Sequence, residues 1–238
     1  MLEDIIANYN IAAVFVYFFL LLVLTKVARY LIFLVPDFRK TREINRKKDI
    51  IKVEKVDYPP VIAATKKVGL ILNLIFLLVV APFALTLDAQ AWWQYPLDIF
   101  LIIMIYDFFY YLMHRFLFHG QTFWRQVHAL HHRARSPTHI DAFYVHWAEN
   151  VMGLGLFIIT IGGLGFYVGG IHAVSVALAF LMWTNQNTIN HVEVNLPYFP
   201  FKILNYLTDK HQVHHENMHK GNYASITPLY DAIFGTLD

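Results

Sequence analysis

The chain of 238 residues is 57% hydrophobic and only 15% charged, which is more apolar than the core of a soluble domain of this size requires. It contains no cysteine, and this excludes disulfide bonds, thiolate-bound zinc or iron–sulfur sites and thioether-linked haem. Its formal net charge of +2 gives no reason to expect a nucleic-acid partner. We therefore predict a single integral membrane domain over residues 1–238.

The first predicted membrane segment covers residues 10–35, in which only Lys26 and Arg29 are charged. At a rise of about 1.5 Å per residue, a helix of this length crosses the roughly 30 Å hydrocarbon layer of a bilayer. A cleaved signal peptide is the alternative interpretation. The stretch is too long for one, however, and no basic region precedes it.

A basic loop is predicted over residues 37–60, between Pro36 and the Pro59-Pro60 pair, with room for a short surface helix. Basic residues concentrate on the cytoplasmic side of membrane proteins, so this loop should face the cytoplasm. Five acidic residues in the loop are outnumbered by eight basic ones. The basic residues are Arg39, Lys40, Arg42, Arg46, Lys47, Lys48, Lys52 and Lys55.

Further spans are predicted over residues 68–87 and 97–116. Their connection holds Trp92, Trp93 and Tyr95 but no Lys or Arg, which is typical of an aromatic belt on the side away from the basic loop. Residues 151–183 are apolar but too long for one straight helix, and several glycines interrupt them. We interpret this stretch as a helical hairpin that returns the chain to the cytoplasmic side.

The expected fold is thus that of an all-α integral membrane protein with about four transmembrane helices. Residues 151–183 would form a broken helical hairpin within it. Residues 114–149 and 187–238 would form a cytoplasmic helical cap on these spans. No alternating pattern long enough for the wall of a β-barrel is present.

Eight of the thirteen histidines fall into three clusters beside these apolar segments. The clusters are His114 with His119, His128 with His131 and His132, and His211 with His214 and His215. Neutral imidazole is the commonest nitrogen ligand of iron, zinc and copper, and residues three or four apart share a helix face. Two clusters repeat the pattern HxxHH, and each is expected to aim three imidazoles at one point. The pattern predicts a metal site at a membrane surface.

From Asp107 onward the sequence resembles the fatty acid hydroxylase and sterol desaturase superfamily of membrane di-iron enzymes. The resemblance rests on the three histidine clusters, on Ser136-Pro137, on His146 with Glu149, and on a tail from Gly221-Asn222-Tyr223 to Phe234-Gly235-Thr236. It implies two iron ions, with zinc able to substitute in purified protein, and O₂ as co-substrate. It also implies a lipid substrate whose unactivated C–H bond is hydroxylated or desaturated.

The resemblance also implies a set of metal ligands. They are His114, His119, His128, His131, His132, His191, His211, His214 and His215. Members of the family often carry a further histidine four residues before the one at His191. Asn187 occupies that position here, so it could bind a metal directly, bind through water or leave an open position.

Two carboxylates are candidates for supporting roles. Glu149 could accept the outer N–H of an imidazole that binds a metal. The alternative is that Glu149 is a solvent-exposed acidic residue at the end of a helix. Asp107 lies two helical turns before His114 in an apolar span, where a carboxylate is expected to be functional or to fix the helix. The remaining histidines, His139, His146, His172 and His219, have no predicted role as ligands.

The expected partners are the membrane, a lipid substrate and a separate electron donor, either a ferredoxin or a cytochrome b5-like protein. A donor is required because the sequence carries no haem-binding or dinucleotide-binding segment. The basic loop could dock such an acidic electron carrier, but positive-inside bias alone is the favoured explanation of its Lys and Arg residues. A bacterial inner membrane is favoured, although an endoplasmic reticulum enzyme would have the same features.

Three other functions fit the residues less well. A metal transporter would place its ligands near the middle of the bilayer, and a membrane cytochrome would leave the HxxHH pattern without a role. A zinc hydrolase needs only about three protein ligands. The lipid, and the choice between an alcohol and an alkene as product, stay open at this level.

Overall fold

The structure, a computed structural model, describes residues 9–196 and 198–238 and is mostly helical there, as predicted. Within these residues, four helices are long and apolar enough to cross a membrane. They are α2 (Ile11–Ile32), α4 continued through a π-helical turn and α5 (Tyr58–Ala84), α6 continued through a second π-helical turn (Gln94–Phe118), and α8 (Trp147–Val168).

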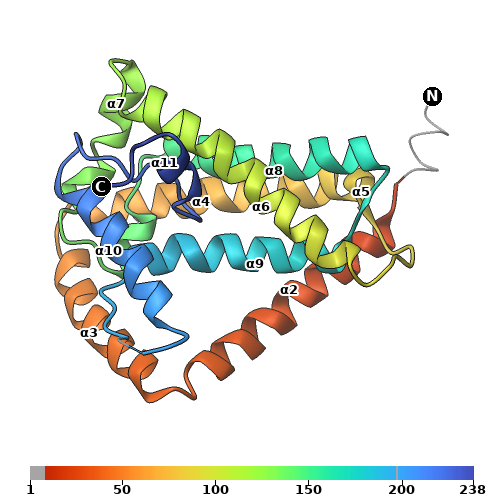
Figure 1. The fold of residues 1–238 in the computed structure, drawn as a ribbon, viewed down its shortest axis with the longest axis horizontal. Helices are drawn as coiled ribbons and strands as arrows, with labels where there is room; N and C mark the ends of the chain where they lie inside the picture. Colours follow the sequence, from red (N-terminus) through yellow and green to blue (C-terminus); the bar gives the residue numbers. More distant parts are fainter. Residues whose placement is uncertain (1–8, 197) are drawn as a thin grey trace.

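A further helix, α9 (Ala173–Asn190), packs against α2 and α6, while α8 packs against α4, α5 and α6. Figure 1 shows these helices side by side. The described core between them is apolar and centres on side chains such as Tyr17, Ile102, Phe157 and Ile161, each almost fully buried. Only α9 among them is rich in amides toward its end, and this end leads to His191.

Most of the basic segment is one helix of 18 residues, α3 (Pro36–Val53), where a loop with room for only a short surface helix was expected. Pro36 begins the helix, where its missing N–H has no partner to lose. Thr41 and Asn45, one turn apart, form the buried face. The Pro59-Pro60 pair likewise lies in the first turn of α4 instead of ending a loop. Helix α4 begins at Tyr58, shortly after α3 ends at Val53.

Helices α8 and α9 form a hairpin. The chain reverses at Gly169 and Gly170, whose φ angles of 80° and 118° favour glycine. The next two residues, β2 (Ile171–His172), pair in parallel with β1 (Leu85–Thr86). At Gly165 a β-carbon would lie 2.7 Å from the Ala84 carbonyl oxygen, so glycine allows α8 and α5 to touch.

The helix bundle has a polar cap at one end. The cap contains α7 (Phe123–His128), two short 3₁₀ turns (His131–Arg133 and His139–Phe143), α10 (Lys202–Glu216) and α11 (Leu229–Ile233). Figure 1 shows α3, α7, α10 and α11 at this end, opposite to α5. The basic helix and the predicted histidine ligands therefore lie at the same end of the molecule.

Candidate metal centre

The nine predicted histidine ligands come together in the cap as two adjacent groups. Within each group the ligand atoms lie within 4.8 Å of one another. The first group consists of His114, His119, His128, His132 and His214. The second group consists of His131, His191, His211 and His215. Each group thus gathers residues from at least three separate segments of the chain.

Each HxxHH motif is divided between the two groups, so the expectation of three imidazoles at one point was wrong. In the first motif, His128 and His132 belong to the first group and His131 to the second. The second motif has the reverse division, because only His214 belongs to the first group. Neighbouring residues of a helix point about 100° apart, whereas residues four apart share a face. An HH pair can therefore supply one ring to each of two sites.

His114 and His119 meet because the end of α6 is a π-helical turn, spanning His114–Phe118. The amide of His119 donates to the carbonyl of His114 at 3.0 Å, which is the five-residue bond of a π-helix. Their ring centroids are 4.9 Å apart. In a regular α-helix, residues five apart diverge. The HxxxxH spacing is the sequence signal for this turn, which we did not predict.

The inner nitrogens of the rings face one another closely. In the first group, Nε2 of His132 lies 3.0 Å from that of His128 and 3.1 Å from that of His214. In the second, Nε2 of His191 lies 3.0 Å from that of His131 and 3.1 Å from that of His211. Two nitrogens bound at about 2.1 Å to one ion, at right angles, would be about 3.0 Å apart. The spacing fits metal coordination.

The outer nitrogens of most of these rings are engaged by oxygen atoms. Nδ1–H of His114, His119 and His214 donates to a carbonyl of Tyr223, Met218 and Gly221, at 2.6, 2.8 and 2.8 Å. In the second group, Nδ1–H of His131 donates to the Tyr144 carbonyl at 3.2 Å and that of His191 to the Asn187 carbonyl at 2.7 Å.

These outer bonds fix the tautomer. A ring whose Nδ1 carries the proton presents a bare lone pair at Nε2, and several lone pairs that converge repel each other unless a cation lies between them. Nε2 of His119 is buried and has no hydrogen-bond partner, which a bound cation would explain. Burial lowers the pKa of His119 to about 4 and that of His191 to about 3, so both rings are neutral at pH 7. The residues fit a metal-binding role.

Glu149, predicted as a supporting carboxylate, contacts one of these rings directly. Its Oε1 accepts the Nδ1–H of His128 at 2.8 Å, and both side chains are buried. Its second oxygen, Oε2, is buried without a partner. His128 thus has a side-chain carboxyl as acceptor for its outer nitrogen where five other rings have backbone carbonyls.

Asp107 contacts the C-terminal segment instead of a histidine. Its carboxylate accepts the backbone amides of Ser225, Ile226 and Thr227 at 2.9 to 3.0 Å, and the Thr227 hydroxyl at 2.9 Å. Just before these residues lie the carbonyls of Gly221 and Tyr223, which accept from His214 and His114. Asp107 therefore anchors a segment that orients two rings of the first group.

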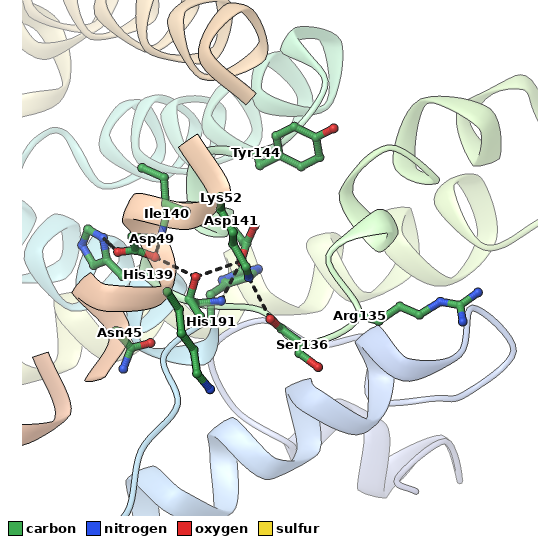
Figure 2. A network of polar contacts seen from close by, with 12 residues as sticks. Asn45, Asp49, Lys52, Arg135, Ser136, His139, Ile140, Asp141, Tyr144 and His191 are labelled. Carbon is green, nitrogen blue, oxygen red and sulfur yellow. Dashed lines mark hydrogen bonds and ion pairs between the residues drawn. The ribbon is translucent and has the colours of Figure 1, made fainter. Parts of the chain in front are cut away.

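A polar network ties α3 to the cap (Figure 2). Lys52 of α3 forms an ion pair with the fully buried Asp141, which also accepts the Tyr58 hydroxyl at 2.8 Å and the Thr138 amide at 2.7 Å. Asp141 lies three residues before Tyr144, whose carbonyl accepts from His131. We did not predict Asp141 from the sequence. The Thr138-x-x-Asp141 capping pattern could have revealed it.

Asn187 lies one helical turn before His191 and lines the same cavity as the histidines, while its side-chain amide donates to the Trp183 carbonyl at 2.9 Å. The other histidines lie outside both groups. His146 and His172 accept backbone amides at the starts of α8 and α9, and His139 lies 3.8 Å from Asp49. His219 is exposed.

A cavity of about 360 Å³ adjoins both groups. It lies between α4, α6, α8 and α9, and its lining includes His114, His128, His131, His191 and Glu149. The walls away from the histidines are largely aromatic and aliphatic. A hydrocarbon chain could therefore reach the histidine groups from within the helix bundle.

The sequence is similar to those of known proteins. A model of the fatty acid hydroxylase family matches residues 99–236. Methylsterol monooxygenase 1 of Rattus norvegicus is 30% identical over 56% of this chain and 44% of its own length. Methylsterol monooxygenase 2-2 of Arabidopsis thaliana is 30% identical over 61% and 54%. Very-long-chain aldehyde decarbonylase GL1-10 of Oryza sativa subsp. japonica is 27% identical over 56% and 44%.

This chain spans about half the length of the curated relatives it matches. No solved structure gives a significant match. The family model covers more than half of the chain, including all nine histidines of the two groups. The resemblance seen in the sequence is thereby confirmed, and the chain belongs to the fatty acid hydroxylase family.

Proposed function

We propose that this protein is a membrane oxygenase that holds two iron ions, one in each histidine group, and uses O₂ to hydroxylate or desaturate an unactivated C–H bond of a lipid. The observation that carries the proposal is the pair of converging histidine groups beside an apolar cavity. Neutral nitrogen ligands suit divalent iron. A single catalytic zinc would need only about three protein ligands, whereas the groups offer five and four.

Bound iron would supply the activation of O₂ and the removal of hydrogen from the lipid. In a hydroxylation, one oxygen atom enters the product and the other leaves as water, which requires two electrons and two protons from a reductant. The chain's own residues orient the ligands and keep bulk water away. Glu149 and the carbonyls of the C-terminal segment hold the imidazoles, and the apolar walls of the cavity exclude solvent.

The reductant is proposed to be a separate acidic electron carrier, a ferredoxin or a cytochrome b5-like protein, that binds near α3. Six basic side chains of this helix are exposed. They are Arg39, Lys40, Arg42, Arg46, Lys47 and Lys48. Because the same basic helix lies at the metal end of the bundle, we also propose that this end faces the cytoplasm.

The test is turnover by the purified, iron-loaded protein in lipid nanodiscs with reduced ferredoxin and ¹⁸O₂. Mass spectrometry of the lipids should show one labelled oxygen per product molecule for an alcohol, or the loss of two hydrogens for an alkene. Metal moving across vesicles without oxidised lipid would support a transporter. Ester or amide cleavage that depends on zinc would support a hydrolase.

A further inference from the structure

The cavity beside the histidine groups has a cationic side chain in its wall. Along α6 its lining runs from Tyr106 through Tyr110 to His114, and along α9 from Phe180 through Trp183 to His191. Both helices thus lead from an aromatic region to the metal groups. Helix α4 contributes Lys66 to the lining, and this residue belongs to a candidate membrane span.

The volume of the cavity suits one hydrocarbon chain. A cavity of about 150 Å³ holds benzene, which is about 25 Å³ for each non-hydrogen atom. On this scale 360 Å³ accommodates roughly 14 such atoms. This matches most of a single acyl chain, whereas a whole sterol has about twice as many atoms. Gly69 and Gly153 line the cavity without side chains and leave room for the chain.

Lys66 has no charged partner among the residues that the structure describes. Its ammonium lies 5.5 Å from the centroid of the Phe143 ring, and Phe143 also lines the cavity. A lysine within an apolar span is costly and is a functional candidate by default. The alternative is that it extends to the head groups of the surrounding bilayer. Lys67 serves as a comparison, because it is also exposed but does not line the cavity.

We propose that Lys66 binds the carboxylate of a single-chain fatty acid, whose hydrocarbon tail extends along Trp183 and Phe180. This inference rests on the proposed function for the fate of the bound lipid, but binding itself requires neither iron nor O₂. The side-chain amide of Asn150 donates to the Thr65 carbonyl at 3.0 Å in the lining of the same cavity, so these two polar groups are paired with each other. Lys66 selects the substrate by its charge.

The experiment measures binding to the purified protein in detergent by quenching of tryptophan fluorescence. The probes are dibrominated octadecanoate and the dibrominated alcohol with the same chain, because bromine quenches a tryptophan that it contacts. The acid should bind with quenching that is lost in Trp183→Phe. Lys66→Met should raise its Kd by roughly 10- to 100-fold, the size expected for a charge-assisted hydrogen bond. Binding of the alcohol should not change.

Lys67→Met is the matched control and should leave both Kd values unchanged. Equal effects of Lys66→Met on acid and alcohol, or no effect on either, would overturn the role of Lys66. Failure of the acid to bind, or quenching unaffected by Trp183→Phe, would overturn the placement of the chain. None of these results would contradict the proposed oxygenase function if the protein oxidises another lipid. Conversely, specific binding of the acid without any oxidation would support Lys66 and contradict the proposed function.

Discussion

Replacing Glu149 by Gln should weaken one of the two metal sites selectively. Glu149 accepts the Nδ1–H of His128 at 2.8 Å, and its other oxygen has no partner. Glutamine can still accept this bond, but the negative charge that strengthens the imidazole as a ligand is lost. Mutation of a carboxylate in this position typically lowers the metal affinity 10- to 100-fold, which corresponds to about 1.4 to 2.8 kcal/mol of binding free energy. Only the first group contains His128, so the second should be unaffected.

The assay is competition with a chelator on the iron-loaded protein, followed by counting the ions retained. One ion should leave Glu149→Gln at about 10- to 100-fold lower chelator concentration than it leaves the unmodified protein, and the other should leave as before. Glu216→Gln is the control, because Glu216 is exposed beside His215. Equal weakening of both ions, or none, would refute the idea that a charged acceptor on His128 tunes the first group alone.

Three further predictions concern the two histidine groups, the ligand set and the packing. Replacing His131 or His214 by Ala should abolish oxidation of the lipid. Because the two residues belong to different groups, elemental analysis of each variant should show about one metal ion fewer per chain. Full activity of either variant would contradict the assignment of these histidines as metal ligands. Asn187→His should keep the helical circular-dichroism spectrum and raise metal occupancy, whereas an unfolded variant would show that the position is structural. Gly165→Ala should lower the free energy of unfolding by about 1–3 kcal/mol, because its β-carbon would overlap α5, while Gly163→Ala, with open space around it, should not; equal stabilities would contradict this packing.

The membrane helices were predictable from the sequence because an apolar run long enough to cross a bilayer seldom occurs in a soluble chain. The full length of the helix over the basic segment, where only a short surface helix was considered, was not predictable, because charged residues there outnumber apolar ones. Asn45 fixes this helix against the chain that follows α9, since its side chain bonds both the Thr41 carbonyl and the Glu193 backbone. Such a contact, between residues far apart in the sequence, has no local signature.

The residues of the candidate site were predictable from the sequence, but their division into two histidine groups was not. Histidine type and clustering indicated eight of the nine rings that the structure brings together, and the family resemblance indicated the ninth, His191. The division of each HxxHH motif between the two groups depends on how α10 packs against the rest of the cap, and the meeting of His114 with His119 depends on a π-helical turn. The anchoring of the C-terminal segment by Asp107 also joins residues more than a hundred positions apart. Tertiary packing determines these features.

The presence of two iron sites in one chain is tested most directly by the metal content of the purified protein after anaerobic iron loading, measured by elemental analysis together with Mössbauer spectroscopy. Because the two histidine groups are adjacent, we expect close to two irons per chain and a spectrum of two coupled ions. One tightly held zinc, or the absorption band of a haem, would contradict a di-iron centre.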